Sequence, residues 1–167
     1  MNHQDNITYL AKTRDGGTPL HFETFCLNEL MDEMKTYAEQ ELEKCGRSNV
    51  HVEIFKDYLK ERNWVHTDRK CLRQILSILL ENAVKHTDKG AILFDYQLPV
   101  LFPVRNNISF FVDDTGNGIH DENDLNLSIA RGLIQQLGGE MEVRPSNDAG
   151  TSVHFNITCT PFDLPKN

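Results

Sequence analysis

The segment that follows Asp68 constrains the fold of this chain more than any other. Asp68 is a residue type that often caps a helix N-terminus, and the apolar residues after it recur at three- and four-residue steps. They form one unbroken stripe: Leu72, Ile75, Leu76, Leu79, Leu80, Ala83 and Val84. This spacing predicts a helix over 69–86 that buries one face in a core.

Shorter segments around this helix predict strands and two more helices. Residues 50–55 alternate apolar and polar side chains, as a half-buried strand does. Further strands are predicted in "NWVHT", "AILFDYQL", "ISFFVDD", "EMEVR" and "TSVHFNIT", and further helices over 28–45 and between Asp124 and Gly138. Helices and strands alternate irregularly, and the last strands are joined by hairpin-length loops. The order favours an α+β fold, a two-layer α/β sandwich whose mixed sheet carries helices on one face.

Composition and charge exclude several classes of protein. The 167 residues suit one domain, and the net charge of −8 disfavours a nucleic-acid partner. No apolar run approaches the roughly 18 residues of a membrane span. The cysteines show no C-x-x-C spacing and are expected to be reduced thiols of a cytosolic chain: Cys26, Cys45, Cys71 and Cys159.

A second face of the predicted helix 69–86 is a candidate site. Ile78, Asn82 and Lys85 are spaced four and three apart, with Glu81 and His86 adjoining them. An amide followed one turn later by an ammonium could hold a metal ion and phosphates. A solvated helix face explains the same pattern.

The segment "DDTGNGI", residues 113–119, follows a predicted strand. Gly116 and Gly118 would allow a planar ligand to come close, and Asp114 could accept a hydrogen bond from an exocyclic amine. A tight turn uses the same residue types. The pair Gly150-Thr151 could likewise be a hairpin turn or a cover for that pocket.

Taken in order, these motifs resemble the four boxes of a known family. "LRQILSILLENAVKHT", "VDDTGNGI", "LNLSIARGLIQQLGGEMEV" and "GTSVHFNI" are similar to the N, G1, G2 and G3 boxes of sensor histidine kinases. Gyrase, the Hsp90 chaperones and MutL belong to the same superfamily. The resemblance implies a Bergerat ATP-binding fold over 26–160. Residues 1–25 would then be the end of a dimerisation-hairpin helix and a linker, and 161–167 a C-terminal tail.

The resemblance also implies a ligand set, with ATP and Mg²⁺ as cofactors. Asn82 would bind Mg²⁺, Lys85 would contact phosphates, and Asp114 would bind the adenine amino group. The implied nucleotide-binding residues are Asn82, Lys85, His86, Asp114, Gly116, Gly118, Ile119 and Thr151. No residue of this chain is implied as a catalytic group.

Three features depart from the family pattern and put phosphate binding in doubt. Ile78 stands where family members carry an amide metal ligand or, in hydrolysing relatives, a catalytic carboxylate, which disfavours a gyrase-like ATPase. Only "HDEND" lies between Ile119 and the next helix, where a lid of some two dozen residues is expected in the family. Asp124 stands where a phosphate-facing glycine is expected, and its charge repels a triphosphate.

The function implied is the ATP-binding catalytic domain of a two-component sensor histidine kinase. None of the seven histidines has the setting of a phosphoacceptor: His3, His21, His51, His66, His86, His120 and His154. The implied partners are therefore an upstream dimerisation and phosphoacceptor domain and a response regulator, in a cytoplasmic homodimeric parent whose membrane anchoring stays open. The alternative is a degenerate, non-catalytic module with weak or no ATP binding that serves as a regulatory or dimerisation partner. A serine kinase of the anti-sigma type is a third, less favoured reading.

Overall fold

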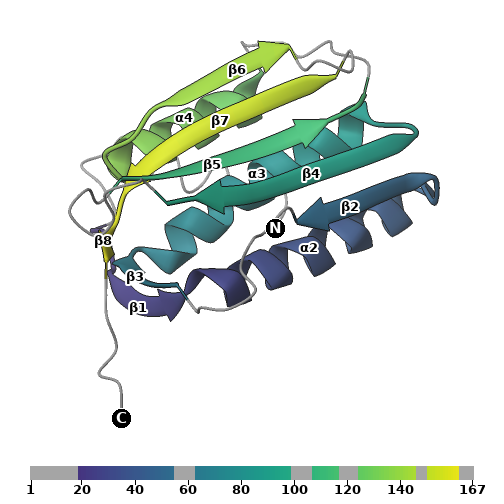
Figure 1. Ribbon diagram of the computed structural model, residues 1–167. Helices are drawn as coiled ribbons and strands as arrows, with labels where there is room; N and C mark the ends of the chain where they lie inside the picture. Colours follow the sequence, from purple (N-terminus) through teal and green to yellow (C-terminus); the bar gives the residue numbers. More distant parts are fainter. Residues whose placement is uncertain (1–18, 55–62, 99–106, 117–123, 146–149, 162–167) are drawn as a thin grey trace.

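The protein folds as a sheet backed by helices. The computed structural model describes residues 19–54, 63–98, 107–116, 124–145 and 150–161. In Figure 1 the strands of the larger sheet lie in front and the helices behind or below it. This arrangement confirms the predicted α+β sandwich.

The larger sheet has five strands and mixed pairing. In chain order they are β2 (Val50–Ile54), β4 (Gly90–Gln97), β5 (Asn107–Asp114), β6 (Met141–Pro145) and β7 (Thr151–Thr158). Their order across the sheet is β2-β4-β5-β7-β6. β2 runs parallel to β4, and every other pair is antiparallel. The mixed character expected from the sequence is therefore confirmed.

Three helices are described: α2 (Leu27–Lys44), α3 (Arg69–His86) and α4 (Leu125–Gln136). α3 packs between the other two and against β5 (Figure 1). The side chain of Asp68 accepts a hydrogen bond from the Cys71 N–H at 2.9 Å, so the predicted cap begins the helix. The bounds of α3 match the predicted range 69–86.

The apolar stripe of α3 forms the centre of the core. Each of its seven residues is at most 3% exposed. The stripe faces a sheet that presents Phe94, Phe110 and Phe155, all buried. The rings of Phe110 and Phe155 are stacked with centroids 4.8 Å apart. Burial of this stripe fixes the rotation of α3 and so decides where its remaining side chains lie.

A second, smaller sheet joins the chain before α2 to the chain after β7. It consists of β1 (Glu23–Cys26), β3 (Trp64–Thr67) and β8 (Thr160–Pro161), in the order β1-β3-β8. β3 was predicted, whereas β1 was not. Phe25 of β1 is buried in the common core. The proposed division at residue 26 stays a prediction, and 1–18 and 162–167 lie outside the described residues.

Two further expectations concern thiols and membranes. All four cysteines are free, and burial raises the pKa of the Cys159 thiol to about 12. Among the helices that the structure describes, none combines the length and apolar character that a membrane crossing requires.

Candidate nucleotide site

The ends of three elements meet at one side of the larger sheet. Asp114 ends β5 and is paired in register with Thr151, the first residue of β7, and with Ile92 of β4. Behind them lies the last turn of α3, which ends at His86. Segments far apart in the sequence, from the predicted N, G1 and G3 motifs, therefore come together.

Asp114 is held in place by backbone hydrogen bonds. The residue is 3% exposed. Its Oδ1 atom accepts from the Gly116 N–H at 2.9 Å and, over a longer 3.4 Å, from the Thr151 N–H. These bonds fix the rotamer of the buried carboxylate. In such a buried position a hydrogen bond to a ligand is stronger than it is in water.

Two glycines allow this close approach. A Cβ atom added at Gly116 would lie 2.1 Å from the backbone oxygen of His86, and one added at Gly150 would lie 1.7 Å from the backbone oxygen of Asp114. Both distances are too short for any side chain. Gly116 therefore brings the turn after β5 against the end of α3, and Gly150 brings the start of β7 against β5.

The pairing of β4 with β5 continues one residue beyond Asp114. The Thr115 N–H donates to the Ala91 carbonyl at 3.1 Å, and the Ala91 N–H donates to Thr115 Oγ1 at 3.0 Å. This pair of hydrogen bonds closes the edge of the site on the β4 side. Neither residue was singled out from the sequence.

The predicted site residues on and near α3 differ in how far their side chains are buried. Asn82 is 7% exposed and Thr151 of β7 is 3% exposed, while Lys85 is exposed and His86 is half-buried. Ile78 is 1% exposed and belongs to the core, so it offers no metal ligand. The predicted residues Gly118 and Ile119 lie outside the described residues.

Arg47, from the loop between α2 and β2, holds the C-terminal end of α3. Its Nη1 group donates to the carbonyls of Val84 and, at 3.1 Å, of Thr87. The Val84 carbonyl also accepts from the Thr87 N–H at 3.3 Å, and a cation at the C-terminal end of a helix favours the helix dipole. The guanidinium further pairs with Asp88 at 3.4 Å. Nothing local in the sequence signals this contact, because its partners lie about forty residues away.

Glu81, the neighbour of Asn82, ties α3 to α2. The Tyr37 hydroxyl of α2 donates to the Glu81 carboxylate. Burial, this hydrogen bond and the charge of Glu81 raise the pKa of Tyr37. Burial raises the pKa of Glu81 as well, against the opposing effect of the Tyr37 hydrogen bond. The contact turns the Glu81 carboxylate toward α2.

The start of α4 is chemically different from the Asp114 side. Asp124 accepts from the Asn126 N–H at 2.7 Å, so a carboxylate of the chain already caps this helix. Asn126 Oδ1 is buried and has no donor among the described residues. A phosphate offers acceptors and negative charge, and this position already carries both. The described residues therefore fit an adenine at Asp114 better than they fit phosphates at α4.

Comparison with known proteins identifies the family. The family model described as "Histidine kinase-, DNA gyrase B-, and HSP90-like ATPase" matches residues 67–161, more than half of the chain. The chain belongs to this family. The match begins at Thr67, the last residue of β3, and includes the elements that form the site: α3, β4, β5, α4 and β7.

Relatives and a solved structure narrow the subgroup to histidine kinases. Hybrid signal transduction histidine kinase B of Dictyostelium discoideum is 27% identical over 117 residues, 57% of this chain and 6% of that protein. Adaptive-response sensory kinase SasA of Microcystis aeruginosa is 27% identical over 113 residues, 56% of this chain and 29% of that protein. The chain thus spans less than a third of either relative.

The structural match is more complete. The catalytic domain of histidine kinase ThkA superposes with a TM-score of 0.67 and 25% identity, covering 85% of this chain and 99% of that one. The fold and family are therefore those of the ATP-binding catalytic domain of two-component sensor histidine kinases.

Proposed function

We propose that this chain binds ATP with the adenine against Asp114 and supplies phosphate to a histidine on another domain. One observation carries the proposal: a buried carboxylate whose Oδ1 is held by backbone N–H groups where β5, β7 and α3 meet. A carboxylate oxygen there can accept a hydrogen bond from the adenine amino group. Gly116 keeps the turn close to α3, and Thr151 closes the β7 side.

The α3 side would contact the metal and the phosphates. ATP supplies the phosphoryl group that is transferred. The Asn82 amide oxygen suits Mg²⁺, a cation that usually takes few protein ligands beside phosphates and water. This agrees with the absence of any cluster of three metal-ligating side chains among the described residues. Lys85, exposed at the end of α3, offers an ammonium to the phosphates.

Phosphoryl transfer needs mainly positioning and charge stabilisation, so the acceptor can lie on a separate domain. We propose an upstream dimerisation domain as that acceptor and a response regulator as the next recipient. The parent protein would act as a cytoplasmic homodimer. These partners are proposed because this chain matches only 6% and 29% of the length of the two histidine kinase relatives.

A second candidate function is favoured by the start of α4. Asp124 caps the helix where phosphates would bind, and Ile78 replaces a polar metal ligand with a core residue. On this alternative the chain keeps the fold, binds ATP weakly or not at all, and serves as a non-catalytic regulatory or dimerisation module.

Titration calorimetry with AMP, ADP and a non-hydrolysable ATP analogue, each with and without Mg²⁺, separates the two candidates. The kinase proposal expects the analogue to bind at least about tenfold tighter than AMP in Mg²⁺, a difference of about 1.4 kcal/mol. Equal affinities would reject the kinase and support the non-catalytic module. Absence of binding by all three nucleotides would also reject the kinase.

A further inference from the structure

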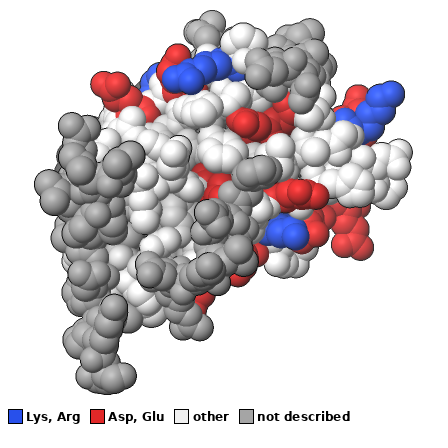
Figure 2. Space-filling model, viewed as in Figure 1, with Lys and Arg blue, Asp and Glu red and all other residues white. Residues whose placement is uncertain are grey.

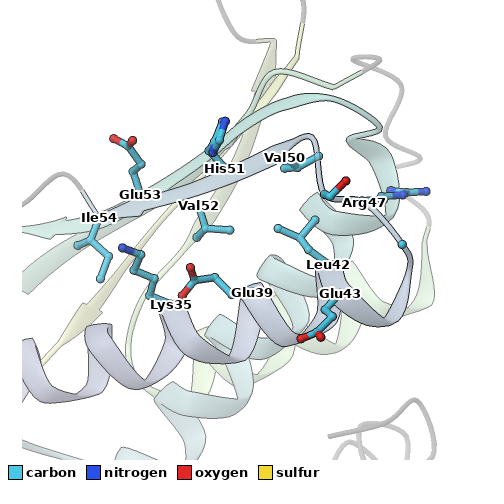
Figure 3. A pocket seen from close by; sticks show the side chains of 12 residues that line it. Lys35, Glu39, Leu42, Glu43, Arg47, Val50, His51, Val52, Glu53 and Ile54 are labelled. Atoms are coloured by element: carbon cyan, nitrogen blue, oxygen red, sulfur yellow. The ribbon is translucent and has the colours of Figure 1, made fainter.

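A groove lies on the other side of the molecule from α4, between α2 and the edge of the larger sheet. It has a volume of about 760 Å³ and is lined by one face of α2, the following loop and all of β2 (Figure 3). The groove is not lined by the candidate nucleotide-binding residues Asn82, Lys85, Asp114 and Thr151. The groove is therefore distinct from the candidate nucleotide site.

The backbone of β2 faces this groove with hydrogen-bonding groups. β2 ends the strand order, and among the described residues it pairs with β4 alone. The Gly90 N–H donates to the Asn49 carbonyl at 3.2 Å. This bond shows that the backbone groups of Asn49 point toward β4. In a parallel ladder alternate residues bond to the same neighbour, so His51 and Glu53 bond to β4. The N–H and C=O of Val52 then point away from β4.

The floor of the groove is apolar. Val50 and Val52 of β2 are buried, as is Leu42 of α2, and Ile54 is half-buried. Figure 3 shows the side chains of Leu42, Val50 and Val52 between the helix and the strand. A segment laid along β2 could bury its own apolar side chains here, one at every second position.

The rim of the groove is acidic. Glu39 and Glu43 project from successive turns of α2, and Glu53 lies on β2 (Figure 3). Among the lining residues the opposing cations are Lys35 and Arg47, and Arg47 is already bonded to the end of α3. The lining residues therefore include three carboxylates and, apart from Arg47, one ammonium group, that of Lys35. This excess of negative charge is complementary to a basic partner.

From these features we propose that the groove binds an extended polypeptide segment with alternating apolar and basic side chains, added as a strand on β2. Backbone hydrogen bonds to Val52 would supply affinity, and the apolar floor and acidic rim would supply specificity. Exposed strand edges are natural templates for such pairing. The inference does not depend on nucleotide binding.

The proposal can be tested with synthetic peptides. A fluorescent five-residue peptide that alternates valine and lysine is compared, by polarisation, with one that alternates valine and glutamate. We expect the lysine peptide to bind at least about tenfold tighter, and a proline at its centre to abolish binding. In heteronuclear NMR the lysine peptide should shift the amide signals of Val52 and Ile54 most. Equal binding of the two peptides, or shifts remote from β2, would overturn the proposal.

Matched variants isolate the role of the rim. Glu39→Gln combined with Glu43→Gln should weaken the lysine peptide by about three- to tenfold. Thr36→Lys combined with Gln40→Lys changes the net charge by the same amount on exposed α2 positions outside the groove, and should weaken it less. If both double variants weaken the lysine peptide equally, only the net charge of the protein matters, and the proposed specific role of Glu39 and Glu43 is wrong.

Two other occupants give distinguishable results. If the Val52 amide is protected from hydrogen exchange without peptide, another segment of this chain already pairs with β2. If the β2 signals change with protein concentration alone, two copies pair there instead. Either result would overturn the proposal.

Discussion

The two ends of the candidate site are built differently. The Asp114 end is assembled from the backbone: N–H groups hold the carboxylate, and glycines bring β5, β7 and α3 within contact distance. The α4 end is made by side chains, with Asp124 occupying the helix terminus. The two ends would therefore accept different parts of a ligand, with a hydrogen-bond donor favoured at Asp114 and an anion disfavoured at α4.

Charge distribution sharpens the comparison. Figure 2 shows acidic side chains across the face of the molecule that carries the open side of the sheet, with few basic ones. Across the whole chain, Asp and Glu outnumber Lys and Arg by 25 to 17. The net charge of −8 disfavours the approach of a triphosphate more than that of a neutral adenine.

The largest expected effect is on the backbone contacts of the Asp114 end. Gly150→Ala places a methyl group 1.7 Å from the Asp114 carbonyl oxygen, so the strands must separate. We expect the free energy of unfolding to fall by about 3 kcal/mol, measured by urea denaturation. Gly46→Ala is the control, because its Cβ meets nothing within 4 Å and only its positive φ of 67° is strained. That variant should lose about 1 kcal/mol. Equal losses would show that the contact is not tight.

The next effect concerns adenine recognition. Asp114→Asn keeps an oxygen for the Gly116 N–H but removes the negative charge, and should weaken AMP binding by about tenfold. Asp113→Asn is the matched control, since Asp113 lies on the opposite face of β5 and accepts from the Ser152 hydroxyl. Unchanged AMP affinity in the Asp114 variant, measured by calorimetry, would remove Asp114 from the site.

A gain of function tests the α4 end. Asp124→Ser retains a capping oxygen but removes the carboxylate charge. The ATP analogue should then gain about 1 kcal/mol, or about fivefold, relative to AMP. Asp68→Ser makes the same change at the N-terminus of α3, the end remote from Asn82, and should leave that ratio unchanged. No gain in the Asp124 variant would mean that phosphates do not approach α4.

The smallest effect tests how α2 supports α3. Burial raises the pKa of Glu81, so the folded state favours its protonated form. The stability it contributes is present below the pKa of the unfolded chain and is lost as pH rises through the raised folded value. Glu81→Gln, which still accepts from Tyr37, should therefore exceed the wild type in unfolding free energy at pH 7 but not at pH 4. Solvent screening limits the difference to about 0.5 kcal/mol. An equal difference at both pH values would contradict this account.

Much of the fold could be predicted because its signals are local and periodic. The stripe of α3, its Asp68 cap and the alternation in β2 are confirmed. β1 escaped prediction because four residues carry too little periodicity, and its partner β3 lies some forty residues away. The Arg47 cap on α3 is likewise a contact of distant residues.

The site was harder to predict than the fold. Their spacing in the sequence left Asn82 and Lys85 compatible with a solvated helix face. Asn82 is buried by tertiary packing, which a local sequence pattern does not predict. The order of the motifs, read through the family resemblance, brought Asn82, Asp114 and Thr151 together. The structure confirms that their elements converge, and their contacts with nucleotide stay a prediction.

The glycine contacts at Gly116 and Gly150 also bear on protein engineering. Because backbone atoms at Gly116 and Gly150 set the separation of β5, β7 and α3, that separation does not depend on the other side chains of the site. A library that keeps both glycines and the Asp124 cap while varying Asn82 and Lys85 should yield well-folded proteins with altered ligand preference. In this scaffold, binding specificity can be redesigned independently of the frame that carries it.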